Sequence, residues 1–113
     1  MVYKLLSVRE WQAAKASGEY AGSAVDVADG FVHFSTAEQV AETALRHFAG
    51  QHSLAMLTVD ADELGDALRW EWSRGGDLFP HLYAPLKLSA VVATVELPDG
   101  VPVDQAVAEV LGA

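Results

Sequence analysis

Residues 54–59 read L-A-M-L-T-V, and this almost continuous apolar run predicts a strand in the centre of a sheet. Upstream of it, residues 37–48 place apolar side chains three and four apart, which predicts an amphipathic helix. Downstream, residues 87–97 centre on V-V-A-T-V and predict a long final strand, and Pro102 opens a last helix. We therefore expect an α+β fold, with a central, strongly twisted mixed sheet, two main helices and a C-terminal helix.

Two pairs of residues have the spacing of a capping box, in which side chains satisfy backbone donors at the start of a helix. Ser7 and Glu10 form the first pair, directly after a strand predicted at residues 2–6. Ser35 and Glu38 form the second, before the amphipathic helix. The sequence therefore predicts one helix that begins after Ser7 and another that is capped by Ser35.

Turn-forming residues mark the stretches predicted as loops, which are residues 19–30 and 74–86. Residues 60–67 form an acidic connection, and residues 68–73 alternate apolar and polar side chains, which predicts a half-buried strand. The side chains expected to be mostly buried are Val40, Leu45, Phe48, Met56, Leu57, Val59, Val91 and Val95.

Composition limits the function classes that the chain can serve. Its 113 residues suit a single domain, spanning 1–113, and no apolar run approaches the roughly 20 residues needed to cross a bilayer. The chain contains no cysteine and shows no secretory leader pattern, so we expect a cytoplasmic protein without disulfides. A net charge of −9 repels the phosphate backbone, so nucleic acid is not an expected partner. Histidine spacing gives no support for a metal site.

The first candidate segment is D-G-F-V-H-F-S-T, at residues 29–36. Residues 31–34 predict a strand, in which His33 shares a face with Ser35 because alternate side chains point the same way. An imidazole, the hydroxyls of Ser35 and Thr36, and a helix start would together suit an anion or a sugar hydroxyl. The alternative is that Ser35 only caps the helix and that His33 is a core histidine.

The second candidate segment is W-E-W-S-R-G-G-D-L-F-P-H-L-Y, at residues 70–83. Glu71 lies on the strand face opposite the tryptophans, close to Arg74, and its carboxylate could orient a sugar or act as a base. Phe79, His81 and Tyr83 offer aromatic faces and a titrating imidazole. The alternative is a solvated strand followed by a loop that aromatic side chains anchor. Because both segments are polar within apolar surroundings, we predict that His33, Ser35, Arg74 and His81 line one cleft.

Together the segments resemble an uncharacterised bacterial family of similar length. Its members carry D-G-F-(I/V)-H-(L/F)-S-T-A-E-Q and S-R-G-G-x-x-F-P-H-L-Y-x-P-L, which match residues 29–39 and 73–86 here. The resemblance implies an ADP-ribosyltransferase-like fold. F-V-H-F-S, A-L-R-H and L-A-M-L-T-V-D-A also resemble elements of the RNA 2′-phosphotransferases, which use NAD, and this likeness places Arg46 at the arginine of their R-H-G element. Their early L-R-H element and basic charge are missing, so their reaction on RNA is not expected here.

The resemblance implies NAD as a possible cofactor, bound between the two segments without a metal. His33 would then bind a ribose hydroxyl, Tyr83 or Phe79 would stack on nicotinamide, and Arg74 would meet the pyrophosphate. Glu71, together with His33, is the candidate for catalysis. A second hypothesis stays open, in which the same pocket binds another small metabolite without catalysis. The sequence predicts no oligomeric state.

Overall fold

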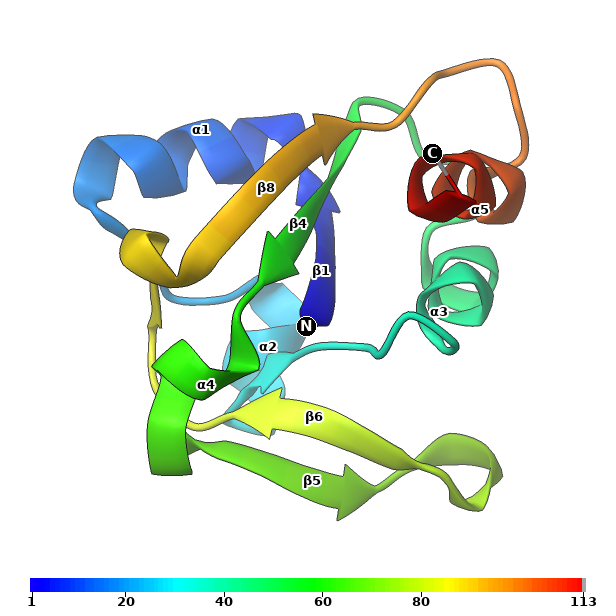
Figure 1. Cartoon of the computed structure of the whole chain (residues 1–113). Helices are drawn as coiled ribbons and strands as arrows, with labels where there is room; N and C mark the ends of the chain where they lie inside the picture. Colours follow the sequence, from blue (N-terminus) through cyan, green and yellow to red (C-terminus); the bar gives the residue numbers. More distant parts are fainter. Residues whose placement is uncertain (113) are drawn as a thin grey trace.

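The computed structural model describes residues 1–112, and at Arg74 only the course of the backbone. Its main sheet contains β1 (Val2–Ser7), β4 (Leu54–Val59) and β8 (Val91–Glu96) in the order β1-β4-β8. The prediction that residues 54–59 form the central strand is therefore confirmed (Figure 1). Both strand pairings are antiparallel, and no parallel pairing occurs among residues 1–112, so the mixed sheet was a wrong prediction.

Side chains of β4 alternate between two hydrophobic clusters, one on each face of the sheet. On one face, β4 packs with Trp11 and Ala14 of α1 (Val8–Ser17). On the other, it packs with α3 (Val40–His47) and α5 (Val103–Gly112). Figure 1 shows α1 on one side of the sheet and α3 beside α5 on the other. A central strand that is buried on both faces explains why its sequence is almost entirely apolar.

The start of α1 follows the prediction. The side chain of Ser7 accepts a hydrogen bond from the Glu10 backbone, and the Glu10 side chain accepts one from the Ser7 backbone. The predicted cap at Ser35 is wrong, because Gln39 is the N-cap of α3 and the Ser35 hydroxyl forms a hydrogen bond with Thr43 instead, while the Ser35 backbone N–H and C=O both pair with Tyr3 of β1. A turn at residues 37–39 follows, in which the Val40 backbone N–H donates to the Thr36 carbonyl, and α3 begins only at Val40.

A second sheet lies below the first in Figure 1 and carries the candidate residues. It consists of β3 (Val32–His33), β5 (Leu68–Trp72) and β6 (Leu78–Leu82) in the order β3-β6-β5. The predicted loop at residues 74–86 is wrong, because most of it forms β6 and the β5–β6 hairpin. Gly75 and Gly76 supply the turn with φ angles of 69° and 76°.

Residues 19–30 also differ from the predicted loop. They contain β2 (Glu19–Tyr20), which pairs with β7 (Leu86–Lys87), and the short helix α2 (Ala24–Asp29). Ser23 and Asp26 form a capping box at the start of α2, and Gly30 ends the helix in the left-handed conformation. The remaining short elements are α4 (Ala61–Leu64), η1 (Gly65–Ala67), η2 (Arg74–Gly76) and η3 (Leu88–Ala90).

The prediction of buried side chains is correct in the centre of the sheet and wrong for some residues outside it. Val40, Met56, Leu57 and Val59 are buried, whereas Phe48 and Val91 are partly buried. Leu45 and Val95 are exposed, because Leu45 lies on the solvent side of α3 and Val95 lies on β8, an edge strand of the sheet. Trp70 and Trp72, expected on a half-buried face, are 48% and 74% exposed. Within residues 1–112, no helix is long and apolar enough to cross a membrane.

Candidate functional site

The pairing of β3 with β6 places two histidines side by side. His33 and His81 are direct partners in this antiparallel pairing, and their ring centroids are 5.6 Å apart. Directly opposite residues project to the same face of a sheet, so both imidazoles share one face. The two candidate segments, almost fifty residues apart in the sequence, thus meet at these rings.

Asp26 holds His33 from the side of α2. Its Oδ1 atom lies 2.6 Å from His33 Nδ1 and also accepts a hydrogen bond of 3.1 Å from the His33 backbone N–H. Lys4 Nζ and the Ser23 backbone N–H each donate to Oδ2 over 2.9 Å. Only 1% of Asp26 is exposed, so this carboxylate is a buried anchor between β1, α2 and β3.

The electrostatics of this anchor follow from its donors. Burial raises the pKa of Asp26, but the hydrogen bond from His33 and the charge of Lys4 outweigh it and hold the pKa well below its usual range. Burial lowers the pKa of the Lys4 ammonium, and the Asp26 carboxylate opposes that change. Asp26 therefore remains an anion that accepts hydrogen bonds throughout the neutral pH range.

Asp29 holds the other nitrogen of the same ring. Its Oδ2 lies 2.9 Å from His33 Nε2, and its side chain is 48% exposed. Carboxylates only accept hydrogen bonds, so His33 can satisfy Asp26 and Asp29 together only as a doubly protonated imidazolium. Asp29 is the last residue of α2 and precedes the turn at Gly30.

His81 has its own carboxylate partner, on β5. Glu71 Oε1 lies 2.9 Å from His81 Nδ1 and accepts a hydrogen bond of 2.7 Å from the hydroxyl of Tyr83. The hydrogen bond from Tyr83 and then that from His81 contribute most to the lowered pKa of Glu71. The hydrogen bond between Tyr83 and Glu71 also raises the pKa of Tyr83. The guanidinium of Arg69 lies over the Tyr83 ring, 5.0 Å from its centroid.

Phe31 joins these groups into one cluster. Its ring stacks on His81 with centroids 4.1 Å apart, and it contacts His33 at 4.5 Å and Tyr83 at 5.3 Å. The apolar ring limits the rotation of both imidazoles, so the histidines are presented in fixed orientations. Fixed orientation is what a binding or catalytic histidine requires.

The histidines open onto a cleft of about 780 Å³ between α2, β1 and α3. His33, Ser35, Phe79 and His81 all line it, so the structure brings together these predicted site residues. Ser35 Oγ lies 2.9 Å from the hydroxyl of Thr43, which also lines the cleft. The other polar residues that line the cleft include Lys4, Glu10, Asp26, Asp29, His47, Gln51 and Ser73.

Other predicted site residues lie beside the cleft or away from it. Glu71 and Tyr83 share the sheet face of His81 but do not belong to the lining that the described residues form. Thr36 donates its backbone N–H to Gln39. Arg46 lies on the surface of α3, paired with Glu42 at 3.0 Å, and does not line the cleft in the described part of the chain. The Arg74 side chain lies outside the described part of the structure.

The sequence analysis missed Asp26, Lys4, Asp29 and Phe31 as site residues. A signal for Asp26 was present, because Ser23 and Asp26 have the spacing of a capping box. Asp26 completes that capping box and also holds His33. Lys4, in contrast, lies on β1, whose sequence shows no pattern beyond that of a short strand. No motif marks Lys4, because its role depends on tertiary packing alone.

The chain matches the family described as Protein of unknown function (DUF952) over residues 5–94. The chain belongs to this family. The matched region contains both candidate segments, together with α2, and stops before α5. The DUF952 region thus includes both histidines and both carboxylates that contact His33, while Lys4 lies just before its first matched residue.

Solved structures of a relative support the fold. The X-ray crystal structure of protein CC0527 from Caulobacter crescentus is 52% identical, with a TM-score of 0.87, and the match covers 95% of this chain and 97% of that one. The solution NMR structure of CC0527 is 55% identical, with a TM-score of 0.77 and coverage of 89% and 90%. No curated protein matches the chain.

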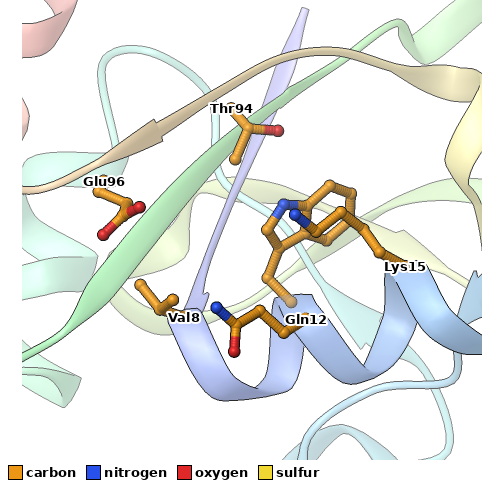
Figure 2. A pocket seen from close by; sticks show the side chains of 6 residues that line it. Val8, Gln12, Lys15, Thr94 and Glu96 are labelled. Atoms are coloured by element: carbon orange, nitrogen blue, oxygen red, sulfur yellow. The ribbon is translucent and has the colours of Figure 1, made fainter.

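A second hollow, of about 400 Å³, lies between α1 and β8 in this DUF952 chain. Figure 2 shows Gln12 and Lys15 of α1 on one side of it, with Thr94 and Glu96 of β8 opposite. The Lys15 ammonium lies over the ring of Trp11, 5.9 Å from its centroid. No histidine lines this hollow, so the paired histidines make the larger cleft the candidate site. Across residues 1–112, no group of three or more potential ligands is placed to hold a metal ion.

Proposed function

We propose that this chain is an NAD-binding domain of the ADP-ribosyltransferase type, with NAD bound in the cleft beside His33 and His81. The observation that carries the proposal is the pair of neighbouring imidazoles, each held at Nδ1 by a carboxylate. The cleft of about 780 Å³ falls within the range of roughly 300–1,000 Å³ that small-molecule sites occupy. The resemblance of both segments to ADP-ribosyltransferase-like proteins supplies the nature of the ligand.

In this proposal His33 and Ser35 bind ribose hydroxyls. Asp26 fixes Nδ1 of the imidazole, which leaves Nε2 as the nitrogen for the ligand once the Asp29 carboxylate is displaced from it, and Ser35 Oγ can both donate and accept. His81 extends the polar surface, and the buried Phe79 provides an aromatic wall to the cleft. These groups suit a sugar, whose hydroxyls need partners that can donate and accept.

The chemistry proposed for Glu71 follows from its lowered pKa. A carboxylate with a low pKa is a weak base, so it is better suited to stabilise positive charge than to remove a proton. During cleavage of the nicotinamide–ribose bond, the bonding electrons leave with nicotinamide and the ribose becomes cationic. Glu71 would stabilise that oxocarbenium-like ribose, and the nucleophile that then bonds to the ribose carbon would release its own proton to solvent.

A second candidate function is binding of a small metabolite without catalysis. It is favoured by the position of Glu71, whose Oε1 is engaged by His81 and Tyr83 and which lies outside the lining formed by the described residues. A carboxylate held by internal donors serves to orient His81 as well as it would serve a reaction.

One experiment separates the two functions. The protein is titrated with NAD by calorimetry, and the same mixtures are then analysed by chromatography for free nicotinamide. Binding with nicotinamide release supports the transferase, and binding without release supports the non-catalytic module. If calorimetry detects no heat and NAD does not raise the melting temperature, the NAD proposal is wrong.

A further inference from the structure

We infer that the two carboxylates that hold His33 have opposite effects on ligand binding: Asp26 positions the ring, whereas Asp29 competes with the ligand for Nε2. The inference rests on the proposed function, because it takes the ligand to be the one bound in the histidine-lined cleft. Both carboxylates lie on α2 and contact the same ring, at 2.6 Å and 2.9 Å, so their sequence context alone would not distinguish them.

Burial is the first property that separates the two carboxylates. The Asp26 side chain has no exposed surface, whereas that of Asp29 is 48% exposed. Asp26 is also held by Lys4 and by two backbone N–H groups, those of Ser23 and His33. It cannot move without leaving those donors unpaired, so its hold on Nδ1 persists when a ligand binds.

The Asp29 carboxylate, in contrast, can be displaced from His33 at little cost. It lies at the C-terminal end of α2, next to Gly30, and an exposed ion pair contributes little to stability. Its carboxylate occupies Nε2, the ring nitrogen that Asp26 does not hold, and both His33 and Asp29 line the cleft. A ligand that reaches His33 at Nε2 must therefore displace Asp29.

The exchange also indicates which ligand atom replaces the carboxylate. While Asp29 is bound, His33 needs protons on both nitrogens. Once Asp29 leaves, Nδ1–H still donates to Asp26, and Nε2 can be either protonated or bare. A hydroxyl serves both forms, because it can accept from Nε2–H or donate to the bare nitrogen. This position thus suits a hydroxyl, a group that NAD carries on its ribose rings.

The test compares NAD affinity, measured by calorimetry, in the wild type and in the Asp26→Asn and Asp29→Asn variants. Asp29→Asn should bind about two- to fivefold more tightly, as expected for the loss of an exposed ion pair. Asp26→Asn should bind at least about tenfold more weakly, as expected when a group that orients a ligand-binding histidine is lost. Weaker binding by Asp29→Asn would overturn the inference.

A third variant shows whether the effect of Asp29 passes through His33. In a His33→Ala background, Asp29→Asn should leave the remaining affinity unchanged, because no Nε2 is left to compete for. If Asp29→Asn still raises the affinity for NAD in that background, Asp29 acts on the ligand directly and the inference is wrong.

A measurement without NAD keeps this inference separate from the proposed function. Diethyl pyrocarbonate acylates accessible imidazole nitrogens, and peptide mass spectrometry reports each histidine separately. Asp29→Asn should speed the acylation of His33 while leaving that of the exposed His52, 76% accessible in its side chain, unchanged. Equal rates at His33 in both proteins would show that Asp29 does not cover Nε2. Faster acylation without NAD binding would retain the Asp29 contact and reject NAD as the ligand.

Discussion

Lys4 and Asp26 form a buried ion pair that joins the first strand to the helix beside the candidate site. The Lys4 ammonium lies 2.9 Å from Asp26 Oδ2, and both residues are almost completely buried, at 6% and 1% exposed. A buried ion pair must recover the free energy lost when both charges leave water. Asp26 recovers part of it through His33, so the ion pair that supports the fold also fixes the histidine of the site.

The first prediction concerns acid. Because the folded-state pKa of Asp26 lies below its unfolded value of about 3.9, the stabilisation is fully present above that value. It is lost as the pH falls through the folded-state pKa. The melting temperature of the wild type should therefore fall more steeply below about pH 4 than that of a Lys4→Met, Asp26→Asn double variant. Parallel curves from pH 7 to pH 2, followed by circular dichroism, would contradict this prediction.

The second prediction concerns Lys4 alone. Removal of its charge leaves Asp26 with one cationic partner fewer in a buried position. Lys4→Met should lower the free energy of unfolding by about 3 kcal/mol, as measured by urea denaturation. Lys15→Met on the exposed surface of α1 is the matched control, and it should change that free energy by no more than about 0.5 kcal/mol. Equal losses in the two variants would show that the buried pair adds nothing.

The third prediction concerns the hydrogen bond from Tyr83 to Glu71. Tyr83→Phe removes the donor that contributes most to the lowered pKa of Glu71, so the pKa of Glu71 should rise toward its ordinary value. The change can be followed by NMR titration of the Glu71 side-chain carboxyl carbon. Tyr3→Phe serves as a control, because Tyr3 belongs to β1 and makes no contact with Glu71 in the described structure. An unchanged titration in Tyr83→Phe would place the cause elsewhere.

The fourth prediction tests the exposed tryptophans of the hairpin. Trp72 is 74% exposed, so Trp72→Thr should change the free energy of unfolding by no more than about 0.5 kcal/mol. Trp11, at 9% exposed, packs in the core between α1 and the sheet, and Trp11→Ala should lower that free energy by about 3 kcal/mol or more. Urea denaturation followed by circular dichroism measures both. A loss at Trp72 that approaches that at Trp11 would mean that the outer hairpin face is covered.

Sequence patterns predicted those parts of the structure that depend on neighbouring residues. The central strand β4 and the capped start of α1 were predictable, because each rests on neighbours in the sequence: a run of apolar residues, and Ser7 with Glu10. His33 and His81 could be singled out for the same reason, since each belongs to a short polar segment. Their direct pairing depends on the register of β3 and β6, which no local pattern encodes.

The strand β6 illustrates why the rest could not be predicted. Pro80, with Gly75 and Gly76 just before the strand, indicated a loop, because proline cannot donate a hydrogen bond within a sheet. Here the Pro80 carbonyl accepts a hydrogen bond from the Phe34 backbone N–H, just beyond the end of β3. Because β3 has ended there, the sheet does not need the hydrogen bond that a Pro80 N–H would donate. A six-residue helix such as α2 is likewise too short to display the helical spacing of apolar residues. The capping pair Ser23 and Asp26 is therefore the pattern that indicates it.

The last prediction concerns His33, and it separates a binding residue from a structural one. The His33 side chain is 34% exposed, and its loss leaves Asp26 with Lys4 and the backbone N–H groups of Ser23 and residue 33 itself. Asp26 therefore stays paired, and His33→Ala should lower the free energy of unfolding by only about 1 kcal/mol. NAD should raise the melting temperature of the wild type, and this increase should be much smaller in the variant, which keeps only a weak affinity for NAD.

His52→Ala is the matched control for this comparison. His52 is exposed, lies outside the lining of the cleft in the described structure and makes only a long contact of 3.8 Å with Asp99. Its removal should leave both the melting temperature and the response to NAD unchanged. If His33→Ala instead causes a large loss of melting temperature, and NAD does not stabilise the wild type, His33 is a structural histidine. In that case the Asp26–His33 contact exists to hold α2 against β3, and the cleft must recognise its ligand through other side chains.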